Sequence, residues 1–192
     1  MRLTKMQSEI NKAVEFLKNG KVILYPTDTI WGLGCDATNS EAVKKIFTIK
    51  KRAESKAMVI LISEIGQLYD YVEKIPEIAW DMVDFAENPL TIIYPKGKCV
   101  APELLAADGS IAIRLVKDDF CRKIISKFRK AIVSTSANIS GIENPNGFNQ
   151  IDSEILSAVD YVVNWKQKET SGSKPSTIIR LELNGEIKFI RK

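Results

Sequence analysis

Polar side chains follow two apolar segments of the sequence, where they could bind a polar ligand. Thr27-Asp-Thr29 comes directly after the apolar run 23–26, and Ser134-Thr-Ser-Ala-Asn138 comes directly after 131–133. Such groups cost free energy when they are buried without partners, so they must meet backbone, water or a ligand. Both sets are compatible with a turn that satisfies its own backbone and with a ligand site at the carboxyl end of a strand.

Cationic side chains indicate a second chemistry, the binding of anions. Lys50 and Arg52 end a helix-like segment. There they could bind a phosphate chain, or they could simply interact favourably with the negative end of the helix dipole. Arg114 lies within the apolar run 111–116, where it could hold a carboxylate with two hydrogen bonds or face solvent. Arg191 is the penultimate residue, a position at which fraying is the default.

The absence of histidine excludes several mechanisms. An imidazole base, a Ser-His-Asp triad and a histidine-bound zinc are impossible, so an enzyme with this sequence must use carboxylates, hydroxyls, lysine and arginine. The net charge of +4 suits an anionic ligand or transient contact with nucleic acid but requires neither. No GxxxxGK[ST] motif occurs, and Gly32-Leu-Gly34 lacks the third glycine of a dinucleotide-binding loop.

Length and composition predict one globular unit. A chain of 192 residues with 45% hydrophobic residues can bury a substantial core, so we expect a single domain over 1–192. Cys35, Cys99 and Cys121 are widely spaced and odd in number, which favours free thiols in a reducing compartment. No segment has the ~20 apolar residues of a membrane span, and the N-terminus lacks an apolar signal core. We expect a cytoplasmic protein without membrane contact.

Helical and extended patterns alternate early in the chain, and strands crowd together late. The expected helices are 7–19, 39–51, 64–73, 76–87, 118–129 and 151–158. The expected strands are 21–25, 58–62, 90–94, 110–115, 131–135, 160–164, 176–182 and 186–191. This order predicts an α/β fold with a twisted, open, mixed sheet flanked by helices.

Local signals refine these elements. Thr38-Asn-Ser-Glu41 is typical of a capping box that begins a helix. Asp118 is a suitable N-cap for the helix that follows it. The two glycines at 32 and 34 predict a polar turn, and the segment 166–175 is the best candidate for a mobile loop.

Taken in order, the polar motifs resemble those of the YrdC family of threonylcarbamoyl-adenylate synthases over nearly the whole chain. The matching segments are Tyr-Pro-Thr-Asp-Thr at 25–29, Gly-Leu-Gly at 32–34, Lys-x-Arg at 50–52, Pro-Leu-Thr at 89–91, Ala-Ile-Arg at 112–114, Ser-x-Ser-Ala-Asn at 134–138, Pro-Ser-Thr at 175–177, and Arg191. The chain departs from the family at Ala86-Glu-Asn-Pro89, where Trp-Pro-Gly-Pro is usual, and at Ala53, where proline is usual. These departures concern the shape of two loops rather than the chemistry.

The resemblance implies a fold and a reaction. The fold would be a YrdC/RibB-like twisted sheet with a concave, positively charged groove. The enzyme would be a nucleotidyltransferase that joins L-threonine, bicarbonate or CO2, and ATP into L-threonylcarbamoyladenylate and releases pyrophosphate. Other proteins would then transfer the threonylcarbamoyl group to the adenosine next to the tRNA anticodon. Mg2+ would arrive with ATP, because phosphates commonly supply its ligands, and no tightly bound cofactor or protein metal site is expected.

The resemblance also assigns roles to residues. The ATP site would consist of Lys50, Arg52, Ser110, Ser136, Asn138 and Arg191. Within it, Lys50 and Arg52 would be catalytic because they stabilise the leaving pyrophosphate. The threonine site would consist of Thr29, Arg114, Ser134 and Ser176, with Arg114 on the carboxylate.

Two other functions remain as alternatives. The first is a non-catalytic module that binds double-stranded RNA or tRNA, since family members have a basic concave surface. It predicts salt-sensitive RNA affinity without threonine dependence. The second is an ATP-using or sugar-phosphate enzyme on the related dihydroxybutanone-phosphate synthase fold. That chemistry would require acidic metal ligands and a histidine, and this chain has no histidine.

Overall fold

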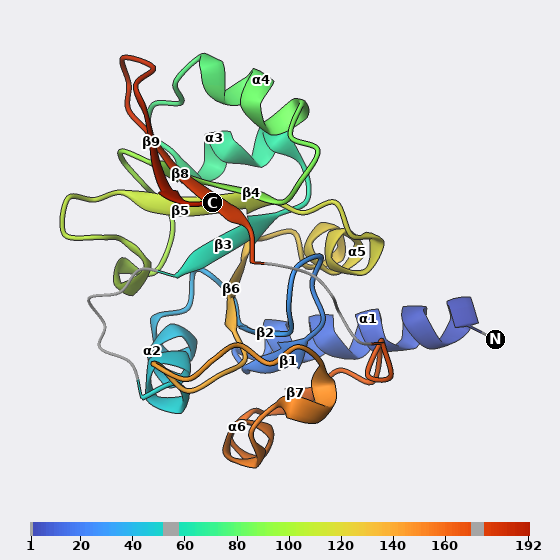
Figure 1. The fold of residues 1–192 in the computed structure, drawn as a ribbon. Coiled ribbons are helices and arrows are strands. Elements are labelled where there is room, and N and C mark those ends of the chain that lie inside the picture. Colours follow the sequence, from blue (N-terminus) through green and yellow to red (C-terminus); the bar gives the residue numbers. More distant parts are fainter. Residues whose placement is uncertain (1, 52–57, 170–174) are drawn as a thin grey trace.

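The computed structural model describes residues 2–51, 58–169 and 175–192, and its centre is a twisted sheet (Figure 1). Among the described residues, nine strands follow one another in the order β7-β1-β2-β6-β3-β5-β4-β8-β9. They are β1 (Ile23–Tyr25), β2 (Gly32–Gly34), β3 (Val59–Ile62), β4 (Leu90–Tyr94), β5 (Ile111–Leu115), β6 (Ile132–Ser136), β7 (Tyr161–Val162), β8 (Thr177–Leu181) and β9 (Ile187–Arg191). The pairs β1–β7, β3–β5 and β4–β8 are parallel and the others antiparallel, which confirms the predicted mixed sheet.

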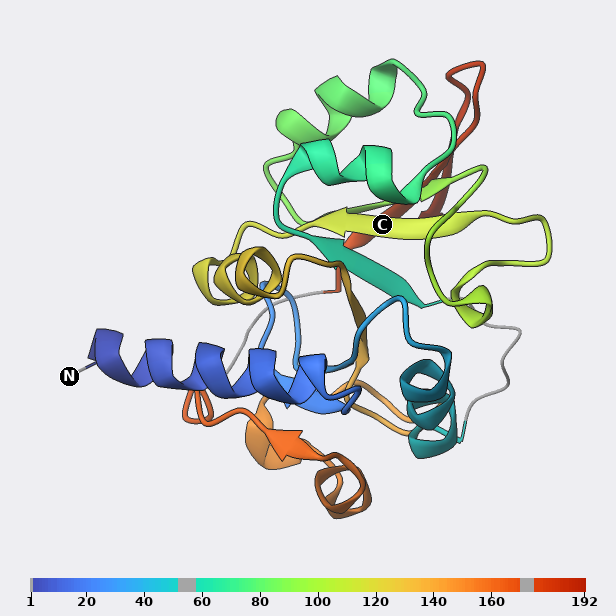
Figure 2. The same cartoon turned by 180° about the vertical axis from the view of Figure 1, so that it is seen from behind.

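Helices lie on both faces of this sheet (Figures 1 and 2). The α-helices are α1 (Arg2–Lys18), α2 (Ser40–Ile49), α3 (Leu68–Tyr71), α4 (Ile78–Asp84), α5 (Asp119–Phe128) and α6 (Ser153–Ala158). Short 3-10 turns are η1 (Ile65–Gln67), η2 (Pro102–Leu104) and η3 (Phe148–Gln150). Within the described ranges, no helix has the length and hydrophobicity that crossing a membrane requires.

The central strands supply two apolar clusters, one on each face of the sheet. On β3, Ile60 and Ile62 belong to a cluster with α2, α3, α4 and α6, whereas Leu61 belongs to a cluster with α1 and α5. This division follows from the strand itself, because successive side chains point to opposite faces. Figure 2 shows α1 and α5 together on the second face. The prediction that 58–62 is a strand covered on both faces is confirmed.

Local sequence signals predicted the N-cap residue of one helix correctly and that of another wrongly. Asp118 caps α5 as predicted, with its Oδ1 accepting a hydrogen bond from the backbone N–H of Cys121 at 3.0 Å. The prediction that Thr38 begins α2 is wrong: the N-cap is Asn39, whose Oδ1 accepts from the backbone N–H of Ala42. Thr38 instead donates its hydroxyl to Asp36, a partner that lies before the helix.

The strand β2 was not predicted, because two glycines disfavour a strand and typically mark a turn. The tertiary structure explains them. A Cβ at Gly34 would lie 2.8 Å from the carbonyl oxygen of Val133 and 2.6 Å from Cε1 of Tyr25. Glycine therefore lets β2 fit between β1 and β6, which brings the loop between β1 and β2 close to the end of β6.

Other boundaries shifted by a few residues. The first helix begins at Arg2 rather than at residue 7. The helix predicted over 64–73 is divided into η1 and α3, and the one predicted over 76–87 is the shorter α4. By contrast, β4 has the predicted limits, 90–94.

Candidate active site

The polar segments identified in the sequence meet at one cavity of about 220 Å³. Six of the predicted site residues line it, namely Thr29, Arg114, Ser134, Ser136, Ser176 and Arg191. All four residues predicted to bind threonine are among them. The cavity therefore joins motifs that are far apart in the chain.

Strand register explains why these side chains meet. Arg114 on β5 is paired with Thr91 on β4, Thr91 with Ile178 on β8, and Ile178 with Arg191 on β9. Side chains of directly paired residues point to the same face of a sheet. Arg114 and Arg191 consequently face the same side although two strands separate β5 from β9.

The cavity lies over a sheet face, which differs from the expected location at the carboxyl ends of strands. Thr29 follows β1 and Ser136 ends β6, as expected, but Ser176 precedes β8 and Val59 begins β3. The sheet is mixed, so antiparallel neighbours bring the beginning of one strand beside the end of another. A rule derived for parallel sheets therefore locates only part of the site.

Arg114 is the buried cation of the cavity, with 6% of its side chain exposed. Its Nη2 lies 3.0 Å from Oδ1 of Asp28, and its Nη1 donates a hydrogen bond to Oγ1 of Thr29 at 3.2 Å. A buried charge is costly unless it is paired. Asp28 therefore compensates Arg114, a role that the sequence patterns did not assign to it.

The loop that carries Asp28 is organised by its own hydroxyls. Oγ1 of Thr27 lies 3.0 Å from Oγ1 of Thr29, accepts from the backbone N–H of Thr29 at 3.1 Å, and donates to the carbonyl of Ile30 at 2.7 Å. Such Ser/Thr turns fix backbone locally. Thr29 thus reaches Arg114 from a preorganised loop.

A second cation, Arg191, lies at the other side of the cavity. Its Nε and Nη2 donate to the carbonyl of Ser176 at 3.0 and 2.8 Å. Burial and the nearby charge of Arg114 lower the pKa of Arg191, although an arginine remains protonated in proteins. Two cations therefore face a space with one carboxylate, Asp28, beside it, an arrangement that favours an anionic ligand.

Thr91 is a residue behind the site that sequence reasoning missed, because it contacts Ser176 without lining the cavity. It is completely buried, and its Oγ1 lies 2.8 Å from Oγ of Ser176. Pro-Leu-Thr is one of the motifs that resemble the family, so the signal was present in the sequence, but nothing there linked it to Ser176.

Lys50 occupies a different position from Arg114. It is 2% exposed, and its ammonium donates to the carbonyl of Asn138 at 2.7 Å, to Oδ1 of Asn138 at 3.1 Å, and to the carbonyl of Ser136. Of the described residues that line the cavity, none is Lys50. In this structure it fixes the turn after β6, and its role as a phosphate clamp stays a prediction. Arg52 lies outside the described residues.

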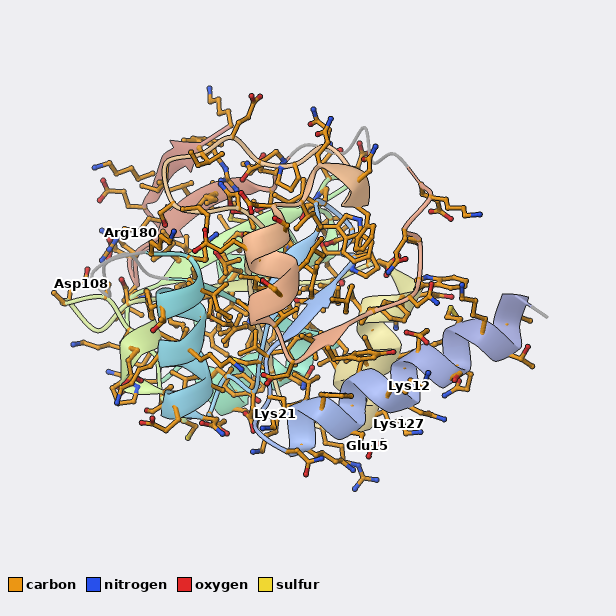
Figure 3. All side chains as sticks on the ribbon, turned by 90° about the horizontal axis from the view of Figure 1, so that it is seen from below. Lys12, Glu15, Lys21, Asp108, Lys127 and Arg180 are labelled. Atoms are coloured by element: carbon orange, nitrogen blue, oxygen red, sulfur yellow. The ribbon has the colours of Figure 1, made fainter. Side chains whose placement is uncertain are left out.

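Ser110 is also apart from the cavity. It is buried just before β5, and its backbone N–H donates to Oδ1 of Asp108 at 2.9 Å. Asp108 in turn pairs with Arg180, whose Nη2 lies 2.8 Å from Oδ2 (Figure 3). Hydrogen bonds from Ser110 lower the pKa of Asp108 to about 2. The assignment of Ser110 to a nucleotide site stays a prediction.

The cavity lacks groups for thiolate chemistry. Burial raises the pKa of Cys35 and of Cys121, so both are neutral thiols near pH 7. Among the parts of the chain that the structure describes, no group of three Cys, Asp or Glu side chains could hold a metal ion. The chemistry available is hydrogen bonding and charge, which binds and positions an anionic ligand.

Comparison with known proteins identifies the family of this chain. The family model described as "Telomere recombination", which covers Sua5, YciO and YrdC proteins, matches residues 15–192. The chain belongs to the Sua5/YciO/YrdC family. The resemblance expected from the motifs is therefore confirmed.

Individual members of the family match most of the chain. A threonylcarbamoyl-AMP synthase of Pseudoalteromonas translucida is 33% identical over 184 residues, which cover 94% of this chain and 97% of that protein. Escherichia coli YciO matches with a TM-score of 0.83 and 25% identity over 97% of this chain and 89% of its own. Pyrococcus abyssi Sua5 in complex with L-threonine matches with a TM-score of 0.80 and 28% identity over 90% of this chain and 50% of its own.

Proposed function

We propose that this chain is a threonylcarbamoyl-AMP synthase, the activity named for its curated relatives. The amine of L-threonine attacks CO2 and loses a proton, which gives a carbamate. A carbamate oxygen then attacks the α-phosphorus of ATP, and the bond from that phosphorus to the β-phosphate bridge breaks. The products are L-threonylcarbamoyladenylate and pyrophosphate.

The cavity with its two arginines carries this proposal. Its volume of about 220 Å³ is below the roughly 300–1,000 Å³ of sites for drug-sized ligands, so it suits an amino acid better than a whole nucleotide. Arg114 offers a cation to the carboxylate, and the hydroxyls of Thr29, Ser134 and Ser176 line the same space. The bound threonine in Pyrococcus abyssi Sua5 supports an amino-acid site in this fold.

The nucleotide would bind next to this pocket. Ser136 lines the cavity and its hydroxyl donates to Oδ1 of Asn138, so the turn held by Lys50 lies directly beside the proposed amino-acid site. We infer that ATP extends from the cavity over this turn, with Arg52 and Arg191 at the phosphates and Mg2+ bound mainly by those phosphates. The demand on the protein is then positioning and charge neutralisation, which requires no histidine.

The product would serve tRNA modification next to the anticodon, through downstream threonylcarbamoyl transferase proteins. This role and a cytoplasmic location are part of the proposal. Direct contact with RNA is the alternative considered from the sequence, and the experiment below includes it.

The proposal is tested by measuring pyrophosphate release from Mg-ATP without tRNA. Threonine and bicarbonate are omitted in turn, and the adenylate product is identified by mass spectrometry. Release that requires both substrates is the expected result. Release that needs neither would contradict the proposal, and absence of release combined with tight, salt-sensitive RNA binding would favour the binding module.

A further inference from the structure

The ion pair between Asp28 and Arg114 is buried but incomplete. The two side chains are 11% and 6% exposed, and the shortest distance between them is 3.0 Å. Nevertheless Oδ1 of Asp28 and Nε of Arg114 have no hydrogen-bond partner among the described residues. The contact is therefore an attraction of charges without the geometry of a hydrogen bond.

An arginine that binds a carboxylate well commonly does so with two parallel hydrogen bonds. Here the guanidinium is turned so that Nη2 faces Asp28 while Nη1 donates to Thr29 in the cavity. Buried polar atoms without partners cost free energy. Of these two atoms, Nε of Arg114 is a donor on a residue that lines the cavity, and a carboxylate ligand could accept its hydrogen bond.

Asp28 is placed to act through Arg114 rather than on a ligand. Of the two, only Arg114 is among the described residues that line the 220 Å³ cavity. Asp28 instead lines a smaller cavity of about 90 Å³, together with Leu115 and Lys117.

We propose that Asp28 is a positioning residue that holds the guanidinium of Arg114 toward the carboxylate of the amino-acid substrate. This inference rests on the proposed function for the identity of that substrate. Asp28 keeps the guanidinium at the cavity wall, so that a carboxylate entering from the cavity meets an oriented donor. Without this anion, Arg114 would be free to turn toward water or toward Thr29 alone.

The test uses conservative variants of Asp28 and a matched control. Asp28→Asn removes the charge and keeps the size, whereas Asp28→Glu keeps the charge. Asp36→Asn is the control, because the side chain of Asp36 is also 11% exposed and pairs with a cation, Lys130, at 2.8 Å, but lies outside the cavity lining. Threonine binding is measured by calorimetry, and the KM values for threonine and for ATP are measured separately.

We expect Asp28→Asn to weaken threonine binding about 10-fold, on the scale of coupling between directly contacting groups, and to change the KM for ATP less than about two-fold. Asp28→Glu should restore most of the affinity, and Asp36→Asn should bind threonine as the wild type does. Threoninamide distinguishes positioning from general damage, because it lacks the carboxylate. The preference for threonine over threoninamide should fall in Asp28→Asn, whereas a structural defect would weaken both ligands equally.

A double mutant tests whether the effect passes through Arg114. In an Arg114→Gln background, Asp28→Asn should cause no further loss of threonine affinity. Unchanged threonine binding by Asp28→Asn, or equal loss for both ligands, would contradict the inference. A wild type that binds threonine but releases no pyrophosphate would contradict the proposed function alone, and a wild type that binds no threonine would contradict both.

Discussion

Two neighbouring regions of one sheet face differ in what covers them. Leu61 on β3 is paired with Ile132 on β6, and both are fully buried in the apolar cluster beneath α1 and α5. Arg114 on β5 is paired with the same Leu61, yet it faces the cavity and Asp28. The lining of that cavity includes no described residue of α1 or α5. The same face is therefore apolar beneath the helices and polar beside them.

The comparison separates stability from function. Beneath the helices, burial removes apolar surface from water and requires no further partner. At the cavity, Arg114 keeps one donor without a hydrogen bond, which is unfavourable until a ligand arrives. We therefore expect substitutions in the covered region to change the free energy of unfolding and substitutions at the cavity to change catalysis.

The largest effect is expected in the covered region. Leu61→Ala should lower the free energy of unfolding by about 2–5 kcal/mol, because it removes buried methyl groups and leaves a cavity. Urea denaturation measures this change, and the KM for threonine of the folded protein should stay the same. Leu183→Ala is the control, since Leu183 is 53% exposed and should change stability by less than about 0.5 kcal/mol. Equal losses of unfolding free energy in Leu61→Ala and Leu183→Ala would contradict the claim that burial beneath the helices stabilises the fold.

Lys50→Ala is expected to have the next largest effect. It should reduce adenylate formation by about 10²-fold, on the scale of a lost preorganised charge. Lys51→Ala is a matched control on the adjacent residue, whose side chain is 60% exposed and pairs with Glu154 at the surface. Turnover by Lys50→Ala equal to that of the control, in folded protein, would restrict Lys50 to a structural role, fixing the turn after β6.

Arg114→Lys examines the cavity side of the comparison directly. Lysine keeps the charge but loses the planar donors that match a carboxylate. We expect kcat/KM for threonine to fall by about 10- to 100-fold, the equivalent of one charged hydrogen bond, with a smaller change in unfolding free energy than Leu61→Ala. If Arg114→Lys loses stability and keeps its kcat/KM for threonine, Arg114 stabilises the fold rather than binding the substrate.

A smaller effect is expected where a buried hydroxyl supports the site. Thr91→Val should raise the KM for threonine by about 3- to 10-fold, because Ser176 loses a hydrogen-bond partner worth about 1 kcal/mol. Thr91→Ser keeps the hydroxyl and should restore the wild-type value. If Thr91→Val keeps the wild-type KM for threonine while Thr91→Ser raises it, the methyl group rather than the hydroxyl matters at this position.

The smallest effect is expected at Asp108, far from the helices that cover the other region (Figure 3). Its pKa is lowered from 3.8 to about 2 in the folded protein, so its contribution to stability is present above pH 3.8 and is lost as the pH falls toward 2. Asp108→Asn should remove this part of the acid dependence. The difference should stay below about 1 kcal/mol, because the carboxylate is 49% exposed to solvent. Acid titrations of the wild type and of Asp108→Asn, followed by circular dichroism, measure this difference in stability. Identical profiles would contradict a contribution of Asp108 to the acid dependence.

Local patterns predicted much of the fold. Alternation and apolar runs located most helices and strands, and Asp118 was identified as a cap because its partner, Cys121, is three residues away. The strand at Gly32–Gly34 was missed because its cause, close packing against Val133, is distant in sequence. Thr38 was assigned wrongly as a cap because Asn39 offered the same chemistry one residue later.

For the site, the sequence by itself determined which chemistry is possible. The absence of histidine excluded imidazole bases, Ser-His-Asp triads and histidine-bound zinc, and the order of the polar motifs indicated the family. These properties depend on residue types and short spacings, which the chain carries before it folds. Family membership follows from the same motifs.

Only the tertiary structure decided which groups act together. Arg114 meets Thr29 across 85 residues, and Thr91 meets Ser176 across the same separation. Lys50 reaches the carbonyls of Ser136, the last residue of β6, and of Asn138 instead of lining the cavity. Strand register and the packing of helices on one half of the sheet set these distances, because they fix which side chains share a face. No local pattern specifies such pairings, and the partnership of Asp28 with Arg114 became visible only in the folded protein.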